Sequence, residues 1–174
     1  MEIIRLIALL LSLSLLLCSC TESPSKLLSY QEKNFRAHVS FQLESLSIGA
    51  VITSRHEPDY IIIEFTSPPS LSGITVKKCG GTTTVTLGDM QLESTEYCRL
   101  AEISSLFEIS GILRKSSVES ISGKKFNRIE LFDTDKNEGY TLYLYKDSGL
   151  PHRIVADLFG KETTLDVISF EFMT

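Results

Sequence analysis

Alternating apolar and polar residues are the most regular pattern along this chain, and they predict β-strands. Between positions 35 and 44, Phe, Ala, Val, Phe and Leu alternate with polar residues, which is the period of a strand with one buried face. The pair Gly80-Gly81 predicts a tight hairpin between two further strands. Turn residues separate the other segments of strand character, which are 48–54, 60–66, 73–79, 82–87, 124–132, 140–146, 152–159 and 163–172.

The segment 96–115 has a different period, which predicts a helix. Its apolar residues recur every three or four positions, as on one face of an amphipathic helix, and include Leu100, Ile103, Phe107 and Leu113. We interpret this stripe either as part of the core or as a movable lid over a ligand cup. A short helix is also expected within 24–33, and 116–122 is expected to form a loop or a short helical turn.

These elements predict a mainly β fold of the α+β class. Short connections between consecutive strands favour antiparallel neighbours. We therefore expect a curved antiparallel sheet, or an incomplete β-barrel, of about nine strands. Because the concave face of such a sheet has to be covered, the amphipathic helix over 96–115 is expected to cover it.

The first twenty residues have the pattern of a bacterial lipoprotein signal peptide. Residues 6–17 are apolar apart from two serines, which suits a signal-peptide core and is short for a membrane span. The run ends Leu17-Cys18-Ser19-Cys20, which resembles the lipobox, where a small residue precedes the cysteine that is diacylated. Cys20 follows the small Ser19, whereas Cys18 follows the bulky Leu17, so we assign the lipid to Cys20. The alternative is an ordinary secretory signal or a signal anchor.

This assignment divides the chain and predicts its location. Residues 1–19 are expected to be the signal peptide, 20–26 the lipidated cysteine and a short tether, and 27–174 the folded domain. A diacylglyceryl group anchors stably because each buried CH₂ contributes about 0.8 kcal/mol. The protein is therefore expected outside the cytoplasm, on the outer leaflet of the cell membrane or, where a second membrane exists, on the outer membrane.

Composition limits the partners of the chain. Its formal net charge is −5 and it has no arginine-rich stripe, which argues against nucleic acid as a partner. A mature chain of about 155 residues suits one domain, which we expect to be a monomer. Cys79 and Cys98 lie within that domain, and outside the cytoplasm such a pair predicts a disulfide; two separate thiols are the alternative.

No residue pattern in the chain indicates catalysis. The three histidines lack metal-ligand spacing, and no G-x-S-x-G motif occurs. The loop 133–139 carries Asp, Asp and Asn at alternate positions, as a calcium loop does, but Glu138 and Leu144 stand where such a loop needs Gly and Glu. This loop is therefore interpreted as a hairpin turn. We expect no enzyme activity, no cofactor and no bound metal.

Towards its C-terminus the chain resembles a family of the bacterial envelope. A strand is followed by a turn from Asp147 to Pro151, a second strand, a glycine turn and a final strand rich in Val and Phe. This pattern is similar to that of the lipoprotein-carrier superfamily of LolA and LolB, with relatives of the RseB and LppX/LprG kinds. The residues that carry the resemblance are Asp147, Gly149, Leu150, Pro151, Gly160, Val167, Phe170 and Phe172, with Pro58, Pro68 and Gly73 upstream.

The resemblance implies an incomplete barrel around an apolar cup, with helices as a lid. Members of the superfamily use this cup to hold acyl chains or lipoproteins, or to sense them. The expected function is therefore that of a membrane-anchored, non-catalytic lipoprotein that binds an acyl chain or a lipidated protein. The alternative is an envelope sensor or protein-interaction module whose core is filled by its own side chains.

Overall fold

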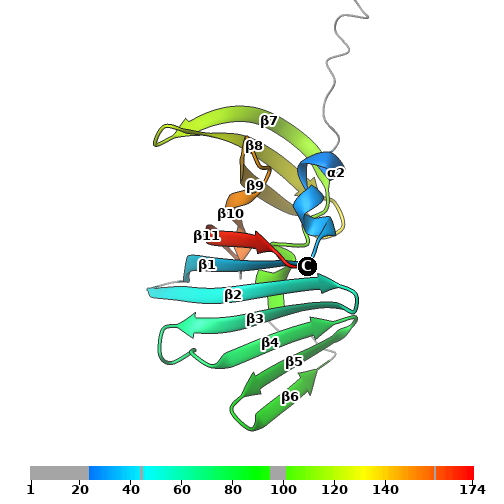
Figure 1. Ribbon diagram of the computed structural model, residues 1–174, viewed down its shortest axis with the longest axis vertical. Coiled ribbons are helices and arrows are strands. Elements are labelled where there is room, and N and C mark those ends of the chain that lie inside the picture. The colour runs from blue at the N-terminus through cyan, green and yellow to red at the C-terminus, as the bar shows by residue number, and fades with distance from the viewer. Residues whose placement is uncertain (1–23, 44, 95–100, 159) are drawn as a thin grey trace, which may run out of the picture.

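One antiparallel sheet makes up most of the computed structural model, which describes residues 24–43, 45–94, 101–158 and 160–174. Within these ranges the sheet has 11 strands in the order β6-β5-β4-β3-β2-β1-β11-β10-β9-β8-β7. It is open, with β6 and β7 at its edges, and Figure 1 shows it curved around one face. The strands are β1 (Phe35–Leu43), β2 (Leu46–His56), β3 (Asp59–Ser67), β4 (Ile74–Cys79), β5 (Thr82–Leu87), β6 (Met90–Ser94), β7 (Ile112–Ile121), β8 (Lys124–Asp133), β9 (Glu138–Tyr145), β10 (Pro151–Leu158) and β11 (Lys161–Phe172).

Short helical elements accompany the sheet in the described ranges. They are α2 (Pro24–Leu27), the 3-10 helix η1 (Ser29–Glu32) and α3 (Glu102–Ser105). Figure 1 shows α2 beside the end of the sheet formed by β7–β9, and the segment that carries α3 behind the middle strands. Among the described residues, no helix is long and apolar enough to cross a membrane.

Strand β1 shows why the alternating sequence folds as it does. Its apolar residues Phe35, Ala37, Val39 and Phe41 are buried, whereas the residues between them are exposed or half-buried. Since successive side chains of a strand point to opposite faces, this alternation places every one of these four residues on the concave face. The strand is central, because β2 pairs with one side of it and β11 with the other.

The order of the strands decides where the connection between β6 and β7 runs. Strands β1–β6 form one series of hairpins and β7–β11 form another, and the pairing of β1 with β11 joins the two series. The chain therefore leaves the sheet at one edge, β6, and re-enters it at the other, β7. The part of this connection that the structure describes, residues 101–110, is here called the inner segment. It packs into the core on the concave face.

The core lies between the concave face of the sheet and the inner segment. Each fully buried Leu, Ile or Phe side chain contributes about 1.5–3 kcal/mol through removal from water. The largest buried side chains of this core come from η1, the inner segment and both series of strands, and they are Tyr30, Phe35, Ile48, Ile52, Ile61, Ile63, Ile103, Leu106, Phe107, Ile129 and Leu142.

The nine predicted strands are all present, but the predicted helix over 96–115 is wrong. Within the described part of that range, α3 covers only 102–105, and β7 begins at Ile112. Gly111 has a φ of +145°, and a Cβ there would lie 2.6 Å from the carbonyl oxygen of Phe132, so the chain turns out of the inner segment at a position suited to glycine.

Two strands, β6 and β7, were not predicted, and the loop expected over 116–122 is wrong because most of it belongs to β7. Both are edge strands that pair on one side, and most of their described side chains are exposed or half-buried. A strand with no fully buried face needs no sustained apolar alternation, so the period that predicts the central strands is weak in β7 and is limited to Met90 and Leu92 in β6.

Candidate functional site

Rows of paired residues extend from the buried core to an exposed apolar surface on the same face of the sheet. Ile63 pairs with Val76, Val76 with Val85, and Val85 with Leu92. Directly paired residues share a face, so this row runs across the concave face from β3 to β6. Exposure rises along it, from 0% for Ile63 and 1% for Val76 to 68% for Leu92.

A second row next to it has the same character. Ile74 pairs with Leu87, and Leu87 pairs with Met90. Leu87 is 44% exposed and Met90 is 69% exposed. We call the five outer residues of the two rows, Ile74, Val85, Leu87, Met90 and Leu92, the apolar shelf. The shelf continues the core, since Ile74 and Val85 pack against the buried cluster.

The inner segment covers the middle of the concave face. Its side chains Ile103, Leu106, Phe107 and Ile109 are buried in the same cluster as the concave side chains of the central strands. The ring of Phe107 lies 5.7 Å from that of Phe35, centroid to centroid. The apolar face of the sheet is therefore closed by the chain's own side chains at its centre and open at the shelf.

The structure places three of the four predicted cup or lid residues in or against one apolar core. Ile103 and Phe107 lie on the inner segment and are buried. Leu113 lies on β7 and is half-buried against the same cluster. Leu100 lies outside the described residues, as do Cys98, Cys20 and Cys18. Cys79 ends β4 and is exposed. Because Cys98 lies outside the described residues, the bridge between the two cysteines stays a prediction.

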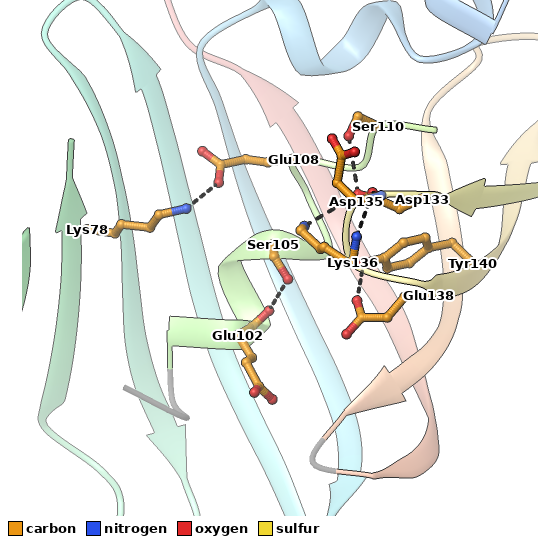
Figure 2. Close-up of polar contacts among 10 residues, drawn as sticks. All are labelled: Lys78, Glu102, Ser105, Glu108, Ser110, Asp133, Asp135, Lys136, Glu138 and Tyr140. Carbon is orange, nitrogen blue, oxygen red and sulfur yellow. Dashed lines mark hydrogen bonds and ion pairs between the residues drawn. The ribbon is translucent and has the colours of Figure 1, made fainter. Parts of the chain in front are cut away.

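Polar contacts hold the C-terminal end of the inner segment. Lys78 Nζ lies 2.9 Å from Glu108 Oε2, and Ser110 Oγ donates to Asp133 Oδ2 at 3.3 Å (Figure 2). With the Gln31 amide oriented to suit both groups, it accepts from the N–H and donates to the carbonyl oxygen of Ile109, each at 3.0 Å. The ion pair is more than one-third exposed at both ends, so it contributes about 1 kcal/mol or less.

Asp133 is a buried carboxylate that organises the turn after β8. Its Oδ1 accepts hydrogen bonds from the backbone N–H groups of Asp135 at 3.0 Å and Lys136 at 3.2 Å. These bonds, with the Lys136 ammonium and the Ser110 hydroxyl nearby, hold the pKa of the Asp133 carboxyl below its ordinary value despite its burial. This carboxylate therefore fixes both its own turn and the end of the inner segment.

The depressed pKa makes the contribution of Asp133 dependent on pH. It is fully present above the pKa of an unfolded Asp, about 3.9, and is lost as the pH falls through the lower pKa of the folded protein. We expect the difference in unfolding midpoint between the wild type and Asp133→Asn, measured by circular dichroism, to be constant from about pH 8 to 5 and to shrink below about pH 4. A difference that is the same in acid as at neutral pH would contradict this role.

A further polar contact near the inner segment joins Tyr140 and Glu138. The Tyr140 hydroxyl donates to Glu138 Oε2 at 2.6 Å (Figure 2). Burial, and after it this bond to Glu138, raises the pKa of Tyr140.

Among the described residues, no three His, Cys, Asp or Glu side chains are placed to hold a metal ion. The hollow beside Phe107 has a volume of about 290 Å³ and a mixed lining, with polar groups from His56 and Asp59.

Sequence reasoning missed the shelf because it missed β6. The segment Leu87-Gly88-Asp89-Met90 carries a signal for the hairpin, since a glycine followed by a second turn residue between two strands is typical of a two-residue turn. Gly88 has a positive φ of 56° at this turn. The alternation of Met90 and Leu92 with Gln91 and Glu93 then indicates a strand with one apolar face.

Comparisons of the sequence give no match, to a protein-family model or to a curated protein. Comparisons of the structure do give matches. An uncharacterised conserved protein from Thermus thermophilus matches with a TM-score of 0.60 and 17% identity, over 88% of this chain and 89% of that one. MucB, in the MucA/MucB complex of Pseudomonas aeruginosa, matches with a TM-score of 0.52 and 14% identity, over 86% of this chain.

This chain spans only 56% of the MucB chain, so the likeness concerns one part of that protein. A LolA superfamily protein from Nitrosomonas europaea matches with a TM-score of 0.46 and 12% identity, over 86% of this chain and 93% of that one. At these identities the likenesses concern the fold alone. The fold of this chain is therefore similar to that of the Thermus thermophilus protein and of one part of MucB, in agreement with the resemblance to LolA and RseB relatives that the C-terminal turn pattern indicates.

Proposed function

We propose that this protein is a non-catalytic, extracytoplasmic lipoprotein that binds an acyl chain, of a lipid or of a lipidated protein, on its concave face. The observation that carries the proposal is the apolar shelf. Its outer residues Leu87, Met90 and Leu92 are exposed to water, yet they share a face with the core and adjoin it. A ligand that covers them removes apolar surface from water and extends a packed interior that already exists.

The free energy of burying an acyl chain on the shelf indicates how much of the concave face such a ligand would use. About six methylenes buried on the shelf would contribute about 5 kcal/mol, at about 0.8 kcal/mol per CH₂. That corresponds to an affinity weaker than micromolar even before the cost of ordering the chain. Tight binding therefore requires more surface, which the ligand would gain by replacing side chains of the inner segment such as Phe107.

The test of this proposal is to look for bound lipid. Residues 21–174, which contain the whole described structure, would be purified without detergent and examined by native mass spectrometry. We expect co-purified acyl lipid, and saturable binding of a fluorescent fatty acid after the lipid is removed. If no lipid co-purifies and the probe does not bind, the proposal is wrong.

The membrane anchor is a separate proposal that rests on Cys20. We expect Cys20→Ala to abolish the incorporation of labelled palmitate into the full chain expressed in bacteria, because the diacylglyceryl thioether forms on this sulfur. Cys18→Ala is the matched control and should leave the labelling unchanged. Labelling that is lost in Cys18→Ala and kept in Cys20→Ala would overturn the assignment.

A second candidate function is that of an envelope sensor or protein-interaction module that binds no lipid. The filled centre of the concave face favours it, since Ile103, Leu106 and Phe107 already occupy the space of a cup. MucB, which has a similar fold over part of its chain, was solved in complex with MucA, and this supports a protein partner here. Absence of bound lipid in the mass-spectrometric test would favour this second function over the first.

A further inference from the structure

Strand β7 is a long open edge of the sheet. It runs from Ile112 to Ile121 and pairs with β8 alone among the described strands. Its sequence contains no proline, and its one irregularity is the register shift between Leu113 and Lys115, near its start. An open edge of this length is a template for another strand, and proteins usually protect such edges. Residues 115–121 form a regular stretch without a proline or a bulge, and its charged residues are one lysine, Lys115, and one glutamate, Glu119.

The side chains of this stretch have definite faces. Ser116 pairs with the buried Ile129, which places Ser116 and Val118 on the concave face. Lys115, Ser117 and Glu119 therefore lie on the convex face. Val118 is 55% exposed. Lys115 is exposed with no ion pair to it seen among the described residues, and Glu119 lies 3.5 Å from Arg128 with 42% of its side chain exposed.

We propose that β7 pairs antiparallel with β7 of a second copy of this chain, about a two-fold axis at Ser117. In this register each Lys115 faces Glu119 of the other copy, and each Ser116 faces Val118. Opposite charges on directly paired residues stabilise antiparallel strands, and the symmetry supplies this pair twice. The inference does not depend on lipid binding, and it replaces the expected monomer by a dimer.

Charge and face together select this register. A two-fold axis that falls between residues would pair convex with concave side chains and would break the continuity of the faces. An axis at Val118 would place Lys115 opposite Ile121, and an axis at Ser116 would place Lys115 opposite Ser117. Among these neighbouring registers, the axis at Ser117 is the one that pairs the exposed lysine with a carboxylate.

Charge reversal tests the register. The full chain, purified in a mild non-ionic detergent, would be measured by light scattering over a concentration series. Because one strand pair is small beside a standard interface of about 1,600 Å², we expect micromolar or weaker dimerisation. Lys115→Glu and Glu119→Lys should each raise the dissociation constant about tenfold, and the double variant should restore it. Association through the N-terminal apolar residues would not respond to these changes.

Several results would overturn the proposal. They are a chain that stays monomeric at about 1 mM, single variants that dimerise like the wild type, and a double variant that fails to recover. A dimer that is lost in Leu92→Glu and kept in Lys115→Glu would place the contact at β6 instead, and would equally overturn it.

Cysteine cross-linking tests the position of the axis in the native membrane. Ser117 faces Ser117 of the other copy in the proposed register, at the Cβ separation of about 4.5–5.5 Å typical of paired residues. Ser117→Cys should therefore form a cross-linked dimer on mild oxidation, above the background that the native cysteines give in the wild type. Ser116→Cys is the matched control, since Ser116 faces Val118. Equal cross-linking of the two variants, or none above background, would overturn the proposed axis.

Discussion

Replacing Leu92 by glutamate should strongly weaken fatty-acid binding while leaving the fold intact. Leu92 is 68% exposed on the edge strand β6, so the free protein loses little packing and keeps the new carboxylate in water. In the complex the same carboxylate would lie against the acyl chain without a partner. Burying a polar group without compensation costs about 2 kcal/mol or more, so we expect binding to weaken about thirtyfold or more.

The neighbouring residue supplies a matched control. Gln91 lies on the same strand with its side chain on the opposite face, because adjacent residues of a strand alternate. Gln91→Glu adds the same charge one position away and should leave fatty-acid affinity within about twofold, since surface charges are screened by salt. Equal loss of binding in both variants would mean that net charge, and not the shelf, governs the interaction.

Replacing Phe107 by alanine should give the largest change in stability of any single substitution in the inner segment. Its ring is buried between the segment and the sheet and lies 5.7 Å from the ring of Phe35. Removal of a buried Phe ring leaves a cavity and costs about 3–5 kcal/mol of unfolding free energy. Urea denaturation followed by circular dichroism would measure this loss. Glu108→Gln is the control, because Glu108 is exposed and its ion pair contributes about 1 kcal/mol or less.

Phe107→Ala also separates the two candidate functions. If an acyl chain replaces side chains of the inner segment, removing the largest of them lowers the cost of that replacement, so fatty-acid affinity should rise although stability falls. If the core is permanently filled by the chain itself, the variant is destabilised and still binds no fatty acid. A variant of wild-type stability would contradict the packing described for Phe107.

Much of the sheet follows from local pattern because its central strands have one fully buried face. In β1, every second residue is apolar: Phe35, Ala37, Val39 and Phe41. Strands pair with both edges of β1, and its concave face packs into the core, so the residues on that face have to be apolar. The edge strands lack this constraint. Val118 is more than half exposed, and the residues around it in β7 show no sustained alternation. In β6 the alternation is limited to Met90 and Leu92, and β6 and β7 are the two strands that were not predicted.

The apolar spacing between 96 and 115 was a correct sign of burial and a wrong sign of a long helix. Ile103, Leu106 and Phe107 are buried as the spacing predicts, but only α3, with four residues, is helical in the described part of that range. Apolar residues three and four positions apart share a face in a single helical turn as well as in a long helix. Their spacing therefore does not specify the length of a helix. Gly111 and the start of β7 end the pattern.

Local residue order by itself establishes the central strands, their hairpins, the turn from Asp147 to Pro151 and the lipobox-like run that ends at Cys20, because each depends on side chains a few positions apart. Only the tertiary structure places β6 and β7 at opposite edges, sends the inner segment across the concave face, and leaves the shelf open beside it. These features depend on which strands pair over long separations. The pairing of β1 with β11 joins the two series of strands, and no short stretch of sequence encodes that contact.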